Sequence, residues 1–261
     1  MKKLYIAILI SIIFPFLKTY AQKTPLLISE YSNASGKYAT KINYQYDNKN
    51  RLIKKIVSQY EINEKGELNK INDLNQKPVT YAYYQDSIVS TADGSWLKII
   101  LNRNGLFEKD VAVNEFSKTN ALTNRLTRSY NQDGFLIKEI LFDDYVTYST
   151  TSTTEYEYKN GNLTKESTKN RRVNQEGEVW ENSGILEYEY SKNTTNSIGN
   201  TNFGTPYLGR SSRNLVLNLK NENGYAAYYE YDFDPKGNVT KRTLIRIADC
   251  VKMSEENYKY Q

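Results

Sequence analysis

The chain of 261 residues contains no histidine and only one cysteine. The absence of histidine excludes Ser-His-Asp and Cys-His catalysis, histidine-ligated zinc and acid–base chemistry by an imidazole. The lone Cys250 can form neither a disulfide within the chain nor a zinc site built from cysteines. The fold must therefore be held by packing and hydrogen bonds, and a chain of this length can bury the core that this requires.

Tyrosine, in contrast, is abundant, with 24 residues against two tryptophans and eight phenylalanines. Together with frequent Thr and Asn, this usage is typical of half-buried strands and turns rather than of helices. No segment beyond the N-terminal region has the periodicity of an amphipathic helix. We therefore expect an all-β protein.

The N-terminus has the pattern of an export signal. Lys2 and Lys3 precede an almost wholly apolar run over residues 4–17, and Thr19 and Ala21 are small residues at the positions that a signal peptidase reads. A membrane span needs about 20 apolar residues, so this run is too short to favour the alternative of a retained anchor. No cysteine follows the run, which argues against a lipoprotein.

These features predict a signal peptide over residues 1–21, with cleavage between Ala21 and Gln22, and a single β-rich domain over residues 22–261. The mature protein would be exported across the inner membrane to the periplasm or the cell surface. We do not expect it to be integral to the membrane.

Export would also remove much of the net positive charge. Lys2, Lys3 and Lys18 leave with the signal peptide and no acid does, so that 32 basic and 30 acidic residues remain. The two signs are interleaved along the chain, whereas a nucleic-acid surface needs a concentrated basic stripe. Neither nucleic acid nor an acidic membrane surface is an expected partner.

An irregular repeat runs through the chain: alternating aromatic residues, a polar turn of Asp, Asn and Gly, then a Leu or Val followed by basic and β-branched residues. The clearest copies cover residues 44–56, 102–106, 130–138, 156–165 and 229–241. Their expected turn residues include Asp47, Gly105, Gly134, Gly161 and Gly237.

Each copy predicts one β-hairpin. The alternation of Glu and Tyr over residues 155–158 and 187–190 has the period of a strand. Asp-Gly and Asn-Gly supply the positive φ of tight hairpin turns. The expected fold is a single large antiparallel β-meander of successive hairpins, curved or partly closed, as in a half-barrel. Residues 191–205, rich in Asn, Thr, Ser and Gly, are expected to form the longest loop.

The turn pattern resembles the Tyr-Asp repeats of Rhs-type secreted shell proteins, here at Tyr46-Asp47 and Tyr231-Asp232. It is more closely similar to a group of secreted Bacteroidota proteins of unknown function, which carry YxYDxxG hairpins and a Leu-Gly-Lys-x-Ser-Lys-Asn-Leu block before the last hairpin. In this chain the block is Tyr207-Leu208-Gly209-Arg210-Ser211-Ser212-Arg213-Asn214-Leu215, with Arg in place of both Lys. The hairpin follows, with Pro235 and a two-residue insertion as departures.

The similarity covers most of residues 40–245, and it implies an open, porin-like β-sheet with no assigned activity. It transfers no catalytic residue. The block at residues 207–214 is expected to be a structural junction, with a strand that begins after Pro206 and a turn or close approach at Gly209. The functional alternative is that Arg210 and Arg213 bind an anionic ligand.

Candidate catalytic and metal-binding residues have simpler explanations. Two pairs of glutamates have the separation of glycosidase carboxylates: Glu155 with Glu157, and Glu187 with Glu189. Each pair lies on one face of a single strand, and exposure of that face to solvent accounts for acidic residues there without a catalytic role. Oxygen clusters at residues 47–50, 131–134 and 143–144 lack calcium-loop spacing and suit hairpin turns. We expect no catalytic residue, no cofactor and no metal. Cys250 is expected to be a small buried strand residue.

The expected function is therefore that of a non-catalytic β-sheet protein, a binding or structural module at the periplasm or cell surface, with a glycan or an envelope protein as a possible partner. One alternative is a glycan-binding protein with tyrosine and tryptophan platforms, including Trp96 and Trp180. A third is an outer-membrane-associated, barrel-like protein. An exposed row of Tyr and Trp would favour glycan binding, whereas a deep cleft with convergent carboxylates would favour an enzyme.

Overall fold

The structure is a computed structural model that describes residues 26–33, 37–63, 68–71, 78–93, 95–113, 125–145 and 147–261. The predicted signal peptide and its cleavage site at Ala21 and Gln22 lie outside these residues. The strands are β1 (Leu27–Asn33), β2 (Tyr38–Tyr46), β3 (Leu52–Ile62), β4 (Leu68–Lys70), β5 (Pro78–Tyr83), β6 (Ser87–Ala92), β7 (Ser95–Leu101), β8 (Phe107–Val113), β9 (Leu126–Tyr130), β10 (Leu136–Asp144), β11 (Tyr148–Lys159), β12 (Asn162–Asn174), β13 (Val179–Thr195), β14 (Asn214–Asn221), β15 (Ala226–Phe233), β16 (Val239–Arg246) and β17 (Lys252–Tyr260).

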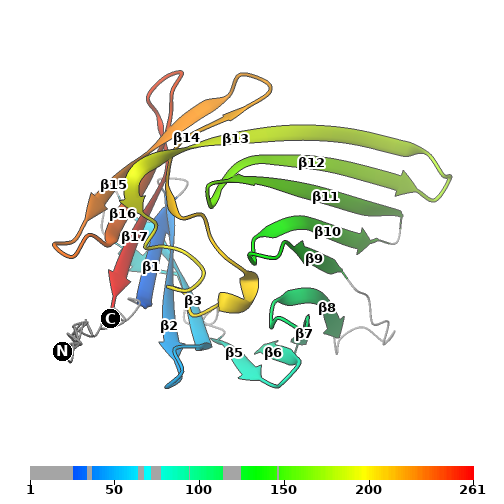
Figure 1. Ribbon diagram of the computed structural model, residues 1–261, viewed down its shortest axis with the longest axis horizontal. Coiled ribbons are helices and arrows are strands. Elements are labelled where there is room, and N and C mark those ends of the chain that lie inside the picture. The colour runs from blue at the N-terminus through cyan, green and yellow to red at the C-terminus, as the bar shows by residue number, and fades with distance from the viewer. Residues whose placement is uncertain are drawn as a thin grey trace, which may run out of the picture.

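All these strands belong to one antiparallel sheet (Figure 1). Successive strands pair with each other, except that β3 pairs with both the short β4 and β5. β1 pairs with β2 and also with β17, which joins the first strand to the last. Between β8 and β9 the ladder is reduced to one residue pair, Lys109 with Thr127. The prediction of a curved, partly closed antiparallel meander is confirmed.

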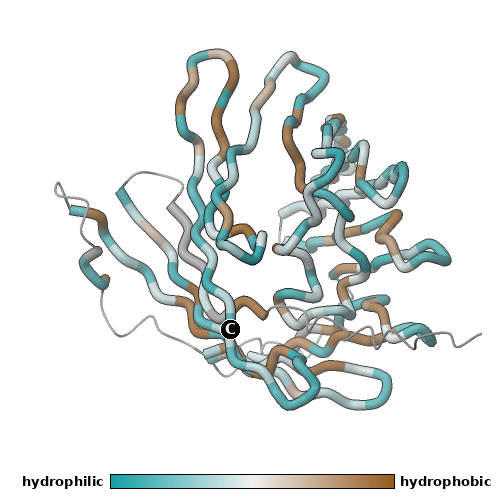
Figure 2. The backbone as a smooth tube through the Cα atoms, turned by 60° about the vertical axis from the view of Figure 1, so that its left-hand side comes forward, coloured by the Kyte–Doolittle hydropathy of each residue, from teal (hydrophilic) through white to brown (hydrophobic). Residues whose placement is uncertain are grey.

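The alternation seen in the sequence sets which side chains face the inside of the curve. Along β11, Tyr156 and Tyr158 are partly buried while Glu155 and Glu157 are exposed. Hydrophobic stretches along the chain are short and interrupted by hydrophilic ones, as Figure 2 shows. Within the described part of the chain, no helix has the length and apolar character that a membrane span requires.

Six of the connections between strands share one five-residue form. In each of them the backbone amide of an Asp or Asn at the first position donates to the carbonyl of the residue four positions later. The carbonyl of that Asp or Asn accepts from the amide of the fourth residue, which has positive φ. The first side chain also accepts hydrogen bonds from the turn, as Asp47 does from the Lys49 and Arg51 amides, both at 2.9 Å. These turns cover residues 47–51, 102–106, 131–135, 174–178, 221–225 and 234–238.

Such a turn places an extra residue in one strand, and the register shifts beside the turn accordingly. A two-residue turn with positive φ at both positions occurs at Asn160-Gly161. The residues expected in turns, Asp47, Gly105, Gly134, Gly161 and Gly237, all lie in these connections.

Because the strands alternate in direction, the connections fall at two ends of the sheet. At one end, which we call the turn end, lie the turns over residues 47–51, 102–106, 131–135, 160–161 and 234–238. The chain ends of the described domain meet there too, where the Gln261 amide donates to the Leu26 carbonyl at 3.0 Å. At the other end, the far end, lie the turns over residues 174–178 and 221–225.

The long connection between β13 and β14, residues 196–213, does not extend into solvent. This inner loop lies within the curve of the sheet at the turn end (Figure 1). It accepts backbone hydrogen bonds from β1 and from the start of β3, through Leu27 N to Asn202 O at 2.9 Å and Leu52 N to Gly204 O at 3.0 Å.

The inner loop also completes the core. Its Ile198 and Phe203 pack against a cluster that contains Leu27, Leu215 and Val239. Farther along, Tyr207 belongs to a second cluster, with Leu208 packed against it; the other buried members of that cluster are Ile88, Ile99 and Phe107. The face that carries the tyrosines is thus covered at the turn end by the protein's own chain.

Three expectations about local structure were wrong. Residues 191–195 continue β13 instead of opening the loop, because the long β13 pairs with β14 as far as Thr195 with Asn214. The strand does not begin directly after Pro206, which instead starts a 3-10 turn, Pro206–Leu208; β14 begins only at Asn214. Cys250 is exposed and has a φ of 55° in the turn between β16 and β17, so that it is not a buried strand residue.

Candidate functional site

The block at residues 207–214, which the sequence marked as a junction, crosses two hairpin turns at the turn end. The Arg210 amide donates to the Gly134 carbonyl at 2.8 Å, and the Arg213 amide donates to the Gly161 carbonyl at 2.9 Å. Tyr207, at 8 % exposure, packs into the core. The backbone of the block therefore ties the β9–β10 and β11–β12 turns to the inner loop.

Serine and asparagine side chains of the block add further connections. The Leu163 amide donates to the Ser212 hydroxyl at 3.1 Å, and the Asn200 amide donates to the Ser211 hydroxyl at 2.7 Å. Asn214 and Asn162 exchange hydrogen bonds, in which the Asn214 amide donates to the Asn162 side-chain oxygen at 2.8 Å. These contacts join the block to β12.

Gly209 is placed where only glycine fits. Its φ is +87°, and a Cβ built on it would lie 2.6 Å from Tyr130 Cε1 and 2.8 Å from the Gly134 carbonyl oxygen. Arg210 and Arg213, the two candidate anion-binding residues, extend from this segment over neighbouring turns. The Arg210 guanidinium lies 6.0 Å from the centre of the Phe135 ring.

The four glutamates that are candidate catalytic acids are exposed and lie on the outer face of the sheet. Three of them pair with lysines of neighbouring strands: Glu155 with Lys138, Glu157 with Lys165 and Glu187 with Lys220, each at 3.1 Å. The fourth, Glu189, accepts from the Asn218 amide group. The solvated-face interpretation accounts for every one of these contacts.

Asp and Asn side chains of the three candidate calcium sites form other contacts. Asp47 caps its own turn and pairs with Arg51 at 2.7 Å. Asn131 accepts from the Phe135 amide, and Asp143 pairs with Arg125. Turn formation and ion pairing therefore account for these side chains.

The buried inward tyrosines near the turn end have structural roles. Burial raises the pKa of Tyr83, Tyr156 and Tyr260 to about 12. The Tyr46 hydroxyl donates to the Leu27 carbonyl at 2.5 Å, and the Tyr83 hydroxyl donates to the Leu52 carbonyl at 2.9 Å. These hydroxyls satisfy backbone groups inside the curve and do not form a ligand platform.

Two exposed aromatic surfaces remain. The first is a groove of about 540 Å³ on the outer face of β6 and β7, lined by Tyr84, Val89, Thr91, Trp96 and Lys98, with Asp86 and Ser87 at its edge. The exposed surface of this groove is mainly apolar, although every lining side chain except Val89 has a hydrogen-bonding group.

The second surface lies on the inward face at the far end, where β11, β12 and β13 run side by side. Arg172 stands opposite Thr150 on one neighbour and opposite Trp180 on the other. Its guanidinium carbon lies 3.8 Å from the Tyr148 ring centre and 5.8 Å from the Trp180 ring centre. Tyr145 stacks on Tyr148 at 4.6 Å between ring centres.

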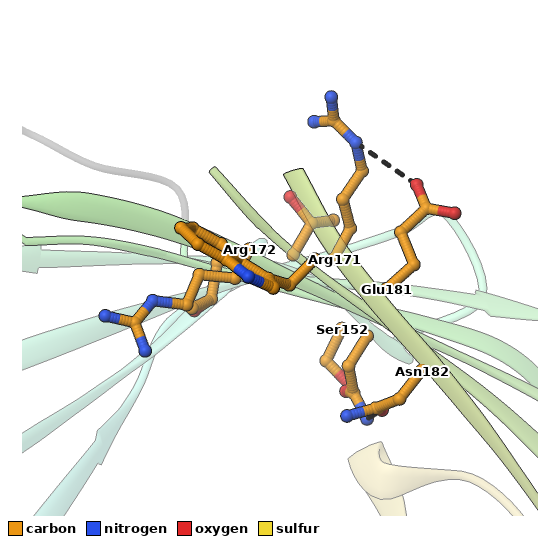
Figure 3. Close-up of a pocket in the computed structure, with 9 residues that line it drawn as sticks. Ser152, Arg171, Arg172, Glu181 and Asn182 are labelled. Carbon is orange, nitrogen blue, oxygen red and sulfur yellow. Dashed lines mark hydrogen bonds and ion pairs between the residues drawn. The ribbon is translucent and has the colours of Figure 1, made fainter. Parts of the chain in front are cut away.

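The same face carries a second row of polar side chains one strand period away. Ser152, Asn170 and Asn182 are cross-strand neighbours, and the Asn170 amide group donates to the Asn182 side-chain oxygen at 2.9 Å. We call this set the β11–β13 site; it consists of Tyr148, Thr150, Ser152, Asn170, Arg172, Trp180 and Asn182. Most of its members line a depression of about 600 Å³ (Figure 3).

The opposite face of these strands differs in character. Arg171 pairs there with Glu181 at 3.4 Å, and Figure 3 shows both side chains on the other side of the strands from Ser152 and Asn182. The outer face thus carries an ion pair at this position, while the β11–β13 site combines the exposed Trp180 ring, the partly buried Tyr148 ring, one arginine and neutral polar groups.

Sequence reasoning named Trp180 but missed Tyr148 and Arg172 as its companions. The sequence did contain information that could have placed Arg172 beside Trp180. The turn over residues 174–178 makes β12 and β13 a hairpin, and the register of this hairpin places Arg172 opposite Trp180. The contribution of Tyr148 depends on the pairing of β11 with β12, whose register shifts beside the Asn160-Gly161 turn.

Comparison with solved structures shows the same kind of sheet. A porin-like protein from Bacteroides uniformis is 15 % identical and superimposes with a TM-score of 0.58, over 90 % of this chain and 98 % of its own. A porin-like protein from Bacteroides vulgatus, 11 % identical, covers 91 % of this chain and 99 % of its own at a TM-score of 0.46. No model of a known family matches the sequence, and neither does any curated protein.

Proposed function

We propose that the protein is an exported, non-catalytic binding protein of the cell envelope, and that the β11–β13 site binds carbohydrate. The observation that carries the proposal is the exposed Trp180 ring, half accessible to solvent, beside Arg172 and above a row of neutral polar side chains. An aromatic face next to hydroxyl and amide groups has the chemistry of a sugar-binding surface, because it offers both an apolar face and hydrogen-bonding groups.

The strands hold this surface in place without help from a ligand. Tyr148, Arg172 and Trp180 come from three adjacent strands, so their side chains are spread over about 10 Å. Cross-strand pairing fixes this spacing, and the stack of Tyr145 on Tyr148 restricts the tyrosine ring. A preformed surface loses little conformational entropy when a ligand binds.

A competing location is the outer groove at Tyr84 and Trp96. The exposed surface of that groove is mainly apolar, whereas the β11–β13 site presents the polar groups of Ser152, Asn170 and Asn182 within one surface. Sugars need directional hydrogen bonds as well as stacking, and this favours the inward site.

The experiment compares three proteins on a panel of neutral and acidic oligosaccharides by isothermal titration calorimetry: the wild type, Trp180→Ala and Tyr84→Ala. Removal of a stacking ring costs about 1–2 kcal/mol of binding free energy, so Trp180→Ala should weaken binding by roughly tenfold. Tyr84→Ala removes another exposed aromatic ring, from the outer face, and should leave binding unchanged. Binding by none of the three, or loss in Tyr84→Ala alone, contradicts the proposed site.

Export is tested separately. The intact mass of the protein recovered from the envelope fraction should correspond to a chain that starts at Gln22. Recovery of the chain with residues 1–21 still attached, in the membrane pellet, contradicts this part of the proposal.

A further inference from the structure

We infer that the β11–β13 site is selective for anionic oligosaccharides, and that Arg172 binds their carboxylate or sulfate groups. This inference rests on the proposed carbohydrate-binding function and specifies its ligand class. It starts from a difference between two neighbouring arginines: Arg171, on the outer face, pairs with Glu181 at 3.4 Å, whereas Arg172, on the inward face, forms no ion pair with a carboxylate of the described residues.

The inward arginines elsewhere in the sheet have carboxylate partners. Arg128 pairs with Glu139 at 2.7 Å, and Arg242 donates through Nε to Glu256 at 2.8 Å. Arg172 differs: no carboxylate of the described residues forms an ion pair with it, and its cross-strand neighbours are Thr150 and Trp180. An exposed guanidinium that forms no ion pair within the chain can bind an external anion.

The aromatic rings orient this guanidinium. With its central carbon 3.8 Å from the Tyr148 ring centre, the Arg172 side chain packs over the tyrosine and is also near Trp180. A guanidinium that uses its face on an aromatic ring keeps its edges, and therefore its N–H donors, available for a planar carboxylate or a sulfate. The ring contacts also restrict the side chain before the ligand arrives.

The remaining polar groups suit the rest of such a ligand. Thr150, Ser152, Asn170 and Asn182 bring neutral hydroxyl and amide groups to the same depression. The carboxylates nearby have their own partners: Glu181, which also lines the depression, pairs with Arg171, and Asp143, opposite Thr150, pairs with Arg125. Uronic acid rings and sulfated sugars carry hydroxyls beside each acidic group, so that Trp180 and the neutral row can contact the sugar while Arg172 binds the acid. Polyanions without sugar hydroxyls would use only one part of this surface.

The test measures binding of tetragalacturonate, a chondroitin sulfate tetrasaccharide and the neutral cellotetraose and maltotetraose to the full mature chain. Variants are Arg172→Gln, Arg172→Lys, Trp180→Ala and, as a matched loss of one charge, Arg103→Gln in the turn over residues 102–106 at the opposite end. Thermal melting of each variant reports whether it folds as the wild type does.

We expect one or both acidic ligands to bind, and their relative affinities to distinguish carboxylate from sulfate. Arg172→Gln should weaken this binding by at least about tenfold, since a charge-assisted hydrogen bond is lost, with Arg172→Lys intermediate and Arg103→Gln unchanged. Added salt should weaken the wild type and affect Arg172→Gln less.

Neutral ligands that bind as well as acidic ones, through Trp180 and regardless of Arg172, would overturn the anionic selectivity and leave the carbohydrate function standing. If the wild type binds no oligosaccharide, both fail. Anionic phospholipid vesicles serve as a further probe; binding to them through Arg172, without binding to any sugar, would also overturn the inference.

Discussion

The Asp110 carboxylate accepts a hydrogen bond from the Leu126 backbone amide at 2.8 Å, and this contact lies between β8 and β9, where the backbone pairing of neighbouring strands is shortest. Only Lys109 and Thr127 pair between β8 and β9 within the described residues. Asp110, 7 % exposed, also accepts from the Arg125 amide at 3.0 Å. One side chain thus substitutes for the backbone hydrogen bonds that the ladder lacks there.

Asp110→Ala should lower the free energy of unfolding by roughly 2 kcal/mol, because two backbone donors would lose their buried acceptor. Asp110→Asn keeps a side-chain oxygen in the same place and should cost less than half of that. Urea denaturation of the two variants checks the prediction. Equal losses in both would mean that the negative charge matters and the acceptor geometry does not.

Gly209→Ala should destabilise the protein by roughly 3 kcal/mol, through a positive φ and a clash with Tyr130 and the Gly134 carbonyl. The control is Gly105→Ala, which has a positive φ of 74° but no heavy atom within 4 Å of the added Cβ, so that only about 1 kcal/mol of backbone strain applies. Denaturant midpoints of both variants give the comparison.

The double substitution Arg210→Ala with Arg213→Ala should cost well under 1 kcal/mol, since the block is held through its backbone rather than through these charges. A double variant that unfolds while Gly209→Ala remains stable would contradict the role of the block as a junction.

Arg242→Met should destabilise the protein by about 2 kcal/mol. Arg242 pairs with Glu256, which also accepts from the Tyr258 hydroxyl, so its removal leaves a largely buried carboxylate without its counter-charge. The matched change in an exposed pair, Lys138→Met opposite Glu155, should cost less than about 0.5 kcal/mol. Similar losses in both variants would show that burial does not distinguish the pairs.

Stability should fall above pH 10. Burial raises the pKa of Tyr83, Tyr156 and Tyr260 from 10 to about 12, so the folded state keeps protons that the unfolded state releases. This contribution is complete below pH 10 and is lost as the pH rises toward 12. The melting temperature should therefore decrease over this range.

The Tyr156→Phe variant removes one of these groups and should show a shallower alkaline decrease in melting temperature than the wild type. Tyr84→Phe, at an exposed position, is the control and should follow the wild type. An unchanged melting temperature across the alkaline range would contradict the burial of the tyrosines.

Much of the architecture was readable from the sequence because strand formation and turns depend on local patterns. Alternation of Tyr with Glu determined the strand faces, as in β11, and Asx with Gly marked the connections that include Gly134 and Gly161. The turn length was not readable, because the side-chain cap and the bulge that it allows become visible only when both strands are paired.

Only the tertiary structure decided where residues distant in the sequence meet. Polar composition predicts a loop over residues 191–205 but not its place. Backbone hydrogen bonds to Leu27, Leu52 and the hairpin turns, together with the burial of Tyr207, place the observed loop, residues 196–213, inside the sheet. The β11–β13 site likewise depends on registers across three strands, which bring Tyr148 to Arg172. Local patterns specify strands, whereas long-range pairing specifies which side chains become neighbours.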